Sequence, residues 1–555
     1  MKEKIGNVVL DYSFYTGEDR YSDGDIEDII LEAFRDGTSE RLLRSSSQWA
    51  VLYHLSDIRE NILEWYPFDP GASLLEIGSG CGALTGLFSR KVKKVTCVEL
   101  SKRRSLINAE RNRKQDNIEI KVGNFKDILI EEKYDYITLI GVWEYAGLYV
   151  GGDEPYISML QKIKGYLKPG GKIIVAIENK MGLKYFNGAP EDHTAKMYSG
   201  INDYAGEKKV RTFSKPEIEK ILDEAGIGKA AFYYPASDYK LPDVIYSDDM
   251  LPQAGDLRYF KKDYADCRVY HFNDAAAFDQ ICTDSVFSYF SNSFLFICGD
   301  TEIQVPFSRY NRLRKKQYRM KTCIVKEGDG RRVIKSALHE EAAKHIAALS
   351  EKERKWKGTL SGIDYVSGEM VNGQYQTPYV DGINLDVSFY RYRHSADAMI
   401  EALKRLIREY LMPGEEQKIP FVMTEEFVRV FGDQAPEGEY SLPVTNADLI
   451  FSNFKMIEGR KPVNFDYEWV FEFPIPYEYV LWRAVYQLYD KFAAYLRPQL
   501  SQEEFAVKAG IRKEHLPIYR RMERKFGKYV CGEKGEEKYI NHYEKSVFTQ
   551  TIQFK

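Results

Sequence analysis

The sequence predicts an α/β protein in which a parallel sheet carries helices on both faces, followed by an α+β region and a helical tail. Between residue 72 and about residue 180, short apolar stretches alternate with helical segments, as parallel strands and crossover helices do. The later stretch "ADAMIEALKRLIREYLM" has the apolar spacing of an amphipathic helix, and the pattern beyond residue 500 is helical and charged. The predicted parts are an N-terminal arm (1–40), the α/β domain (41–300), the α+β domain (301–500) and the tail (501–555).

Composition excludes several classes of protein. The 555 residues are 44% hydrophobic and 29% charged, which is ordinary for a globular protein. A net charge of −4 disfavours nucleic acid as a partner, because non-specific binding depends on a cationic surface. The apolar runs are too short to cross a bilayer, and the start lacks the apolar segment of a signal peptide. Seven scattered cysteines show no paired metal-binding spacing. We therefore expect a reduced, cytoplasmic protein without a transmembrane segment.

The elements follow one another in a regular order. The polar, acidic stretch "YTGEDRYSDGDIEDII" leads into "ERLLRSSSQWAVLYHLSDIRENILEWYPF", which has helical apolar spacing. "RTFSKPEIEKILDEAG" predicts a helix with a serine cap, proline near its start and glycine at its end. "SNSFLFICGD" predicts a last strand near residue 300. The five predicted strands before it are "SLLEIG", "KVTCVEL", "IEIKVG", "YDYITLIG" and "GKIIVAIE".

A glycine-rich segment follows the first of these strands. In "LLEIGSGCGAL", Gly78, Gly80 and Gly82 lie between a buried strand and the start of a helix, where glycine permits a sharp turn and close approach to a ligand. Glu99 ends the next strand, where a carboxylate can accept hydrogen bonds from ribose hydroxyls. The pattern predicts a nucleoside site at the carboxyl edge of the sheet. Because the spacing up to Ala83 also fits a dinucleotide pattern, a dinucleotide is the alternative ligand.

The fuller pattern around Glu76 resembles motif I of the class I S-adenosylmethionine (SAM) methyltransferases. The later segments "VGNF", "YDYITLIGVWEY" and "LKPGGKIIVAIEN" are similar to the third, fourth and fifth strand regions of those enzymes. The resemblance implies a Rossmann-like methyltransferase domain over 41–300 and favours SAM over a dinucleotide. The cofactor contacts that it implies are Glu76, Gly78, Gly80, Gly82, Glu99, Asn124, Phe125 and Gly141.

Methyl transfer requires a nucleophile held in line and, for some acceptors, a base that takes its proton. "GLKYFNGAPEDHTAKMYSG" follows the fifth strand, where methyltransferase substrate loops lie, and it contains the polar cluster Glu191, Asp192 and His193. We predict that these three residues are catalytic, with His193 as the base. The alternative is that His193 only caps or hydrogen-bonds the loop. Tyr239 and Lys240 are further candidates for the lining of this pocket.

A second constellation lies in "VTNADLIFSNFKMIEGRKPVNFDYEWVF". In kinases an aspartate receives the acceptor proton, an asparagine five residues later binds a metal ion, and a later aspartate binds the metals that bridge the phosphates. Asp448, Asn453 and Asp466 have this spacing, and the string resembles choline-kinase-like and aminoglycoside-phosphotransferase-like enzymes. "RRVIKSALHEEAAKHI" resembles the strand whose lysine binds phosphates, here Lys335. The resemblance implies a kinase-like domain over 301–500 that uses ATP and Mg²⁺, with Asp448 catalytic and Asn453 and Asp466 on the metal.

Two features depart from the kinase pattern. Asn446 replaces the histidine of the usual loop, and no glycine-rich phosphate loop precedes Lys335. The basic stretch "FSRYNRLRKKQYRMKT" stands there instead. Its Arg and Lys side chains suit phosphates, but a solvated basic hairpin is the favoured interpretation. A kinase fold that serves only as a scaffold is the alternative for the whole domain.

Together the two domains resemble the bifunctional enzymes that terminate O-antigen chains, and the strings "YHLS", "IENKMGLKYF" and "EDH" resemble methyltransferases of bacterial surface-polysaccharide biosynthesis. The resemblance implies a glycan or lipid-linked saccharide as substrate, phosphorylated and methylated at one end. It also implies a peripheral location at the inner face of the membrane and a glycosyltransferase partner that binds the C-terminal helices. The alternatives are an active methyltransferase with a binding or scaffold domain, and an RNA or protein methyltransferase, which the acidic balance disfavours.

Overall fold

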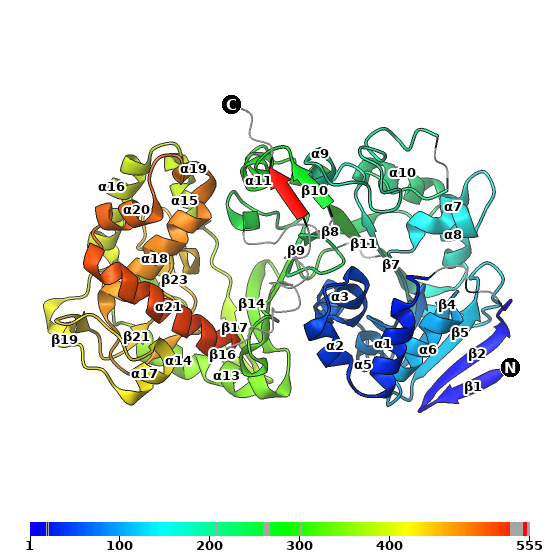
Figure 1. The fold of residues 1–555 in the computed structure, drawn as a ribbon, viewed down its shortest axis with the longest axis horizontal. Coiled ribbons are helices and arrows are strands. Elements are labelled where there is room, and N and C mark those ends of the chain that lie inside the picture. Colours follow the sequence, from blue (N-terminus) through cyan, green and yellow to red (C-terminus); the bar gives the residue numbers. More distant parts are fainter. Residues whose placement is uncertain are drawn as a thin grey trace.

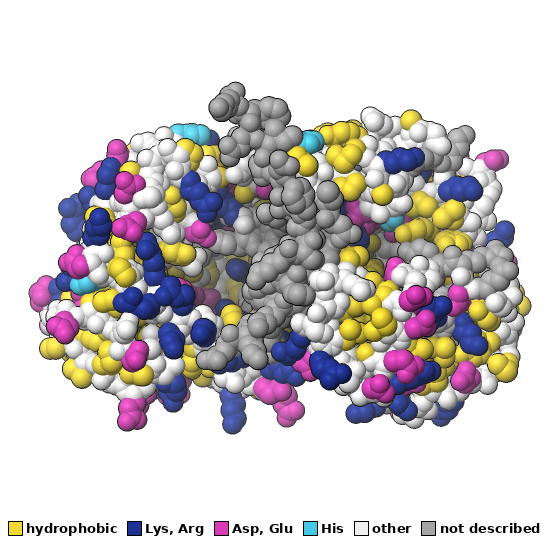
Figure 2. Space-filling model, in the orientation of Figure 1, with side chains coloured by type: hydrophobic (Ala, Val, Ile, Leu, Met, Phe, Trp, Pro, Cys, Tyr) yellow, Lys and Arg dark blue, Asp and Glu magenta, His cyan; other side chains and the backbone are white. Residues whose placement is uncertain are grey.

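The structure is a computed structural model that describes residues 1–17, 19, 22–206, 209–258, 267–299, 302–532 and 548–551. The chain forms two halves, drawn from blue to green and from green to red in Figure 1. On the face shown in Figure 2, basic and acidic side chains are interspersed over both halves. Among the described residues, no helix is both long enough and apolar enough to cross a membrane.

Five parallel strands form the centre of the first half, in the order β5-β4-β3-β6-β7. The chain moves outward from β3 in one direction and then from β6 in the other, so a topological switch point lies between β3 and β6. Two further strands continue the sheet beyond β7, where β11 runs antiparallel between β7 and β8. The bounds are β3 Ser73–Ile77, β4 Lys94–Glu99, β5 Ile118–Gly123, β6 Tyr134–Ile140, β7 Leu167–Glu178, β8 Ala230–Ala236 and β11 Ser293–Cys298.

Helices cover both faces of this sheet. Successive strand residues point to opposite faces, and Leu74 and Leu75 accordingly belong to two different core clusters. The helix predicted in "RTFSKPEIEKILDEAG" is confirmed, with Ser214 and Glu217 forming a capping box. The helices of this half include α3 Trp49–Leu55, α5 Thr85–Lys91, α6 Lys102–Arg111, α8 Pro155–Lys164 and α10 Lys215–Glu224.

The N-terminal segment is not an arm that stands apart from the sheet. Strands β1 (Lys2–Ile5) and β2 (Val8–Phe14) extend the sheet, with β2 parallel to β5, and helix α1 (Ile26–Arg35) packs against α6. The alternating side chains of Val8 and Leu10 are buried in the core of the first half. The polar and acidic composition of residues 1–40 predicts an arm, because it obscures the short alternation of buried and exposed residues in β2.

The same sheet continues into the second half. Strand β9 (Val244–Ser247) pairs antiparallel with β12 (Phe307–Tyr310), so the sheet crosses the predicted boundary near residue 301. Strands β13, β14, β17 and β16 follow in that order, and the remaining part is mainly helical. The bounds are β13 Met320–Glu327, β14 Gly330–Ala337, β16 Glu369–Val371, β17 Gln374–Pro378, α16 Ala396–Leu406 and α18 Tyr477–Lys491.

The helices of the predicted tail belong to the core of the second half. Helices α20 (Gln502–Lys508) and α21 (Leu516–Cys531) bury Phe505, Tyr519 and Phe526 in the same cluster as α18. Strand β25 (Phe548–Thr551) pairs with β10 (Cys267–Tyr270). The rest of the predicted tail, 533–547 and 552–555, lies outside the described residues.

Candidate active site

A cavity of about 670 Å³ lies at the carboxyl ends of the central strands. Its walls come from the loops that follow β3, β4, β5, β6 and β7, and helix α3 also contributes. In an open α/β sheet, ligands bind in this crevice at the switch point, because the loops there diverge from one another. The cavity is therefore the candidate active site of the first half.

The glycine loop forms one wall of the cavity. Gly78 and Gly80 have φ values of +72° and +52°, a region that other residues rarely adopt. A Cβ atom on Gly78 would lie 2.4 Å from Cγ2 of Val142, whereas a Cβ on Gly80 would meet no atom within 4 Å. Gly80 lines the cavity. Its missing side chain therefore leaves the backbone accessible to a ligand.

Gly82 has a different role from the predicted cofactor contact. It is not among the residues that line the cavity. Its φ is +73°, and a Cβ there would lie 2.3 Å from Oδ1 of Asn108 and 3.0 Å from the Cα of the same residue. Gly82 therefore permits close packing against α6, and its contribution to the site is indirect.

Two buried carboxylates hold the loop in place. Glu99 is 5% exposed and lines the cavity; its Oε2 accepts a hydrogen bond from the Gly80 N–H (2.7 Å) and its Oε1 from the Ser101 N–H (2.9 Å). Burial raises the pKa of Glu99, although Arg104 and both amides oppose the shift. Glu76 accepts a hydrogen bond from the Thr85 hydroxyl (2.6 Å), and burial raises its pKa to about 7. Glu99 thus joins the glycine loop directly to the end of β4.

The remaining predicted cofactor residues, Asn124, Phe125 and Gly141, also line the cavity. The side-chain oxygen of Asn124 accepts a hydrogen bond from the Lys126 N–H (3.0 Å), which closes a tight turn after β5. Gly141 has a φ of +70°, and a Cβ there would lie 2.6 Å from the hydroxyl of Tyr239. Tyr239 and Lys240 line the same cavity, so the structure brings both candidates to this site.

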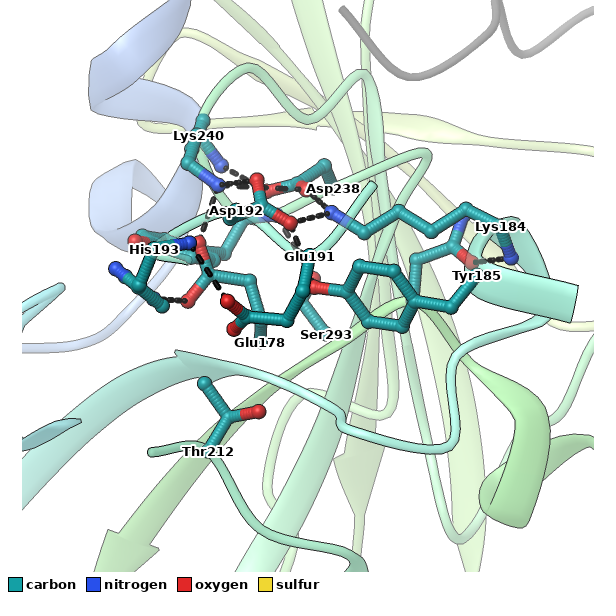
Figure 3. Close-up of polar contacts among 12 residues, drawn as sticks. Glu178, Lys184, Tyr185, Glu191, Asp192, His193, Thr212, Asp238, Lys240 and Ser293 are labelled. Atoms are coloured by element: carbon teal, nitrogen blue, oxygen red, sulfur yellow. Dashed lines mark hydrogen bonds and ion pairs between the residues drawn. The ribbon is translucent and has the colours of Figure 1, made fainter. Parts of the chain in front are cut away.

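The predicted catalytic cluster lines the same cavity, in the loop after β7, and Figure 3 shows its polar contacts. Glu191 accepts hydrogen bonds from the backbone N–H groups of His193 (2.9 Å) and Thr194 (2.7 Å), so it shapes the loop. Asp192 forms ion pairs with Lys184 (2.8 Å) and Lys240 (3.0 Å). Glu191 and Asp192 are therefore engaged in holding the loop, which leaves His193 as the candidate base among the three.

His193 is held between two polar groups. Its Nε2 lies 3.3 Å from Oε2 of Glu178, and its Nδ1 lies 3.1 Å from the hydroxyl of Tyr145. Burial lowers the pKa of His193, but the carboxylates of Glu178, Glu144 and Glu191 together outweigh burial and raise it to about 9. An imidazole that keeps its proton near neutral pH is a poor base, so the pairing with Glu178 argues against the predicted role of His193 in this arrangement.

Several cavity residues were not predicted. Glu178 ends the fifth strand at the carboxyl edge, which is a signal that the sequence contains. Asp23 comes from the predicted arm and lies 2.8 Å from Arg104 Nη2 and 2.7 Å from His54 Nε2. Nothing in its local sequence distinguishes Asp23 from the other acidic residues around it.

The second predicted site also assembles. The Lys335 ammonium donates a hydrogen bond to Oδ1 of Asp466 (2.7 Å), and the Asn453 amide donates one to Oδ2 of Asp448 (3.0 Å). Asn446 donates to the carbonyl of Asp466 (2.9 Å) and accepts from the Asp448 N–H (2.9 Å). Asn446 thus orients this loop through its amide.

The basic stretch before Lys335 joins the antiparallel strands β12 and β13 as a hairpin, as predicted, but three of its arginines are in ion pairs and are not solvated. Arg314 pairs with Glu468, which also lies 2.9 Å from Nε2 of His345. Arg312 and Arg319 reach Asp57 of the first half at 3.3 and 3.4 Å. These arginine side chains are held in ion pairs, because carboxylates from both halves lie next to them. Arg314 lies beside the constellation, since Glu468 is two residues after Asp466.

Comparison with known proteins gives a family match within the first half. The family described as "Methyltransferase domain" matches residues 49–227. These residues form a methyltransferase domain. The match covers the glycine loop, Glu99 and the loop with His193, and the strand order agrees with the predicted Rossmann-like fold. No curated protein matches the chain.

Solved structures of methyltransferases are similar to parts of the chain. A Haloferax volcanii methyltransferase in complex with its Trm112 activator is 17% identical, with a TM-score of 0.29, over 48% of this chain and 96% of the other. Phosphoethanolamine N-methyltransferase 1 of Haemonchus contortus is 16% identical, with a TM-score of 0.26, over 38% and 46%. DhpI, solved with SAM and HEP, is 14% identical, with a TM-score of 0.25, over 37% and 91%. The assignment of the domain rests on the family match and the strand order.

Proposed function

We propose that the chain is a SAM-dependent methyltransferase that binds SAM in the cavity of the first half. The observation that carries the proposal is the Gly80–Glu99 junction. At this junction the accessible backbone of Gly80 and the buried carboxylate of Glu99 line the same cavity. Both residues lie in the segment that matches the methyltransferase domain family. The fit is good because a Cβ on Gly80 would project into open space, which leaves room for a ligand against the backbone.

The cavity supplies a defined set of contacts for SAM. Glu99 would accept hydrogen bonds from the ribose hydroxyls, and Asn124 and Phe125 would lie against the adenine. The glycine loop would face the remainder of the molecule through its backbone. Bound SAM would supply an electrophilic methyl group. The residues of this chain would contribute by positioning the acceptor in line with that group.

The acceptor would bind at the end of the cavity that contains Glu178, His193 and Lys240 (Figure 3). Charged side chains of both signs meet there, and such groups can orient hydroxyls by donating and accepting hydrogen bonds. We propose a glycan or lipid-linked saccharide as the acceptor. This choice is supported by the sequence resemblance to enzymes of surface-polysaccharide biosynthesis.

The test is transfer of label from methyl-labelled SAM to bacterial glycan extracts by the full-length protein. The Glu99→Gln variant removes the charge at the ribose contact and should transfer label at least about tenfold more slowly, since charge-assisted hydrogen bonds contribute about 1.5–3 kcal/mol. Glu132→Gln is the control, because Glu132 is a surface residue that pairs only with Lys94 in the described structure. Equal transfer by wild type and Glu99→Gln would refute the assignment.

A second activity, phosphotransfer, is proposed for the second half. It is supported by the pairing of Lys335 with Asp466 beside the pairing of Asp448 with Asn453. Asp466 and the Asn453 amide oxygen are the oxygen ligands that Mg²⁺ prefers, and Lys335 suits the phosphates of ATP. The alternative is a binding or scaffold domain with no nucleotide.

Thermal unfolding of the full chain with and without Mg·ATP separates these alternatives. Binding should raise the melting temperature of the wild type and of Asp364→Asn, whose aspartate is exposed on β15 (Asp364–Tyr365). Asp466→Asn should abolish the rise. An unchanged wild-type melting temperature at millimolar Mg·ATP would favour the scaffold.

A further inference from the structure

Three potential metal ligands meet at the acceptor end of the cavity. Ligand atoms of Glu144, Glu178 and His193 all lie within 4.8 Å of one another. Glu144 lies in a single 3-10 turn (Trp143–Tyr145) soon after β6, and Glu178 ends β7. Because β6 and β7 are parallel neighbours, their carboxyl ends bring the two carboxylates together, and the loop after β7 adds the imidazole.

One oxygen of the Glu144 carboxylate, Oε2, lacks a hydrogen-bond partner among the described residues. This oxygen is buried, and Glu144 lines the cavity and is only 1% exposed. Buried polar atoms in folded proteins almost always have partners, because an unpaired carboxylate in a buried site is costly. The unpartnered oxygen is therefore available to bind a group from outside the chain.

The spacing of the ligand atoms suits a metal ion. Nε2 of His193 and Oε2 of Glu178 are 3.3 Å apart. Two ligands at about 2.1 Å from an ion and this far apart subtend an angle of about 100°, between the tetrahedral and octahedral values. The other oxygen of Glu178 pairs with Lys240, so the oxygen that faces the imidazole remains for the ion.

The surroundings of His193 also resemble those of a metal ligand. When one imidazole nitrogen binds a metal, the other commonly donates its hydrogen to a nearby oxygen, which fixes the tautomer and the orientation of the ring. Nδ1 of His193 lies 3.1 Å from the hydroxyl of Tyr145 and can donate to it. Tyr145 thus provides the outer contact that a ligand at Nε2 requires.

We propose that Glu144, Glu178 and His193 bind one divalent cation. Two carboxylates and one imidazole suit Mn²⁺ or Zn²⁺, and the ion would take the place of the proton on Nε2, which leaves to solvent. Three protein ligands leave open positions for an acceptor oxygen, whose pKa the ion would lower. This last role rests on the proposed methyltransferase function, whereas binding of the ion does not.

The experiment is titration of the full-length protein with Mn²⁺, followed by electron paramagnetic resonance, which separates free from bound Mn²⁺. We expect one bound ion per chain in the wild type. Removal of one ligand by Glu144→Gln should weaken binding at least about tenfold, since even outer-shell changes cost 10–100-fold. Glu144→Asp, which keeps a carboxylate, should restore part of the affinity.

The control is Glu478→Gln. Glu439, Glu478 and His515 form the other cluster of this kind among the described residues, but Arg512 pairs there with Glu439 and Glu478. Glu478→Gln should leave Mn²⁺ binding unchanged. No bound Mn²⁺ in the wild type, equal affinity in Glu144→Gln, or loss of binding in Glu478→Gln alone would each overturn the proposal.

Calorimetry with S-adenosylhomocysteine on the same proteins keeps the two proposals distinguishable. Glu144→Gln should retain binding of S-adenosylhomocysteine, because Glu144 is not among the residues that we assign to the cofactor. If the wild type binds Mn²⁺ but not S-adenosylhomocysteine, the metal site stands and the proposed methyltransferase function fails. The reverse result overturns the metal site alone.

Discussion

Alanine substitution of two glycines in the same loop should affect stability and cofactor binding to different degrees. Gly80 and Gly82 are two residues apart and have φ values of +52° and +73°, so a Cβ strains the backbone at both positions. Only Gly80 lines the cavity. A Cβ at residue 80 would meet open space, whereas one at residue 82 would lie 2.3 Å from the Asn108 side chain and 3.0 Å from the Asn108 backbone.

The sizes of the two effects follow from these contacts. The left-handed conformation costs a residue with a Cβ about 1–2 kcal/mol, so Gly80→Ala should destabilise the protein by about that amount. Gly82→Ala should add about 1–3 kcal/mol of overpacking, because the Asn108 backbone cannot move aside easily, for a total of about 2–5 kcal/mol. Gly80→Ala should weaken cofactor binding at least about tenfold, equivalent to about 1.4 kcal/mol.

Urea denaturation measures the free energy of unfolding, and calorimetry with S-adenosylhomocysteine measures binding, both on the full chain. Gly82→Ala should unfold more easily than Gly80→Ala, and its folded fraction should bind S-adenosylhomocysteine more tightly than Gly80→Ala does. The reasoning fails if Gly80→Ala is the less stable protein, or if it binds S-adenosylhomocysteine as the wild type does.

Two further predictions concern packing and charge. Phe526 is 4% exposed in the core of the second half, so Phe526→Ala should lower the free energy of unfolding of that half by about 3–5 kcal/mol in a urea titration; a loss below about 1 kcal/mol would show that α21 is not part of this core. Lys240 pairs with Glu178 and Asp192 in the cavity wall, so Lys240→Met should destabilise the first half by about 3–5 kcal/mol, as removal of one partner from buried ion pairs does. Unchanged urea stability of Lys240→Met would mean that these pairs contribute nothing to folding.

The parts of the site that depend on local order could be predicted from the sequence. The glycine loop follows one strand directly, and Glu99 is the last residue of the next strand. The carboxyl ends of parallel strands meet at one edge of the sheet. Glu178 and Lys240 are 62 residues apart, and their contact depends on how the loops fold over that edge. Asp23 is farther away still, since it reaches Arg104 across 81 residues. No local pattern specifies such contacts.

In the second half, too, the sequence predicts a helix but not the surface against which the helix packs. The apolar spacing of α21 predicts an amphipathic helix, but spacing alone does not tell which surface covers it. The structure places that face in the core beside α18, where Phe526 packs near Phe431 and Trp469. The sequence alone also does not show which groups Asn446 bonds, because its two hydrogen bonds join it to residues 2 and 20 positions away.

The most direct test of the account is calorimetric titration of the full-length protein with S-adenosylhomocysteine. The account predicts one site per chain, with affinity at least about tenfold weaker in Glu99→Gln because a buried, charged hydrogen-bond acceptor is lost from the ribose contact. Failure of the wild type to bind, or binding that Glu99→Gln leaves unchanged, would contradict the claim that this cavity holds the methyl donor.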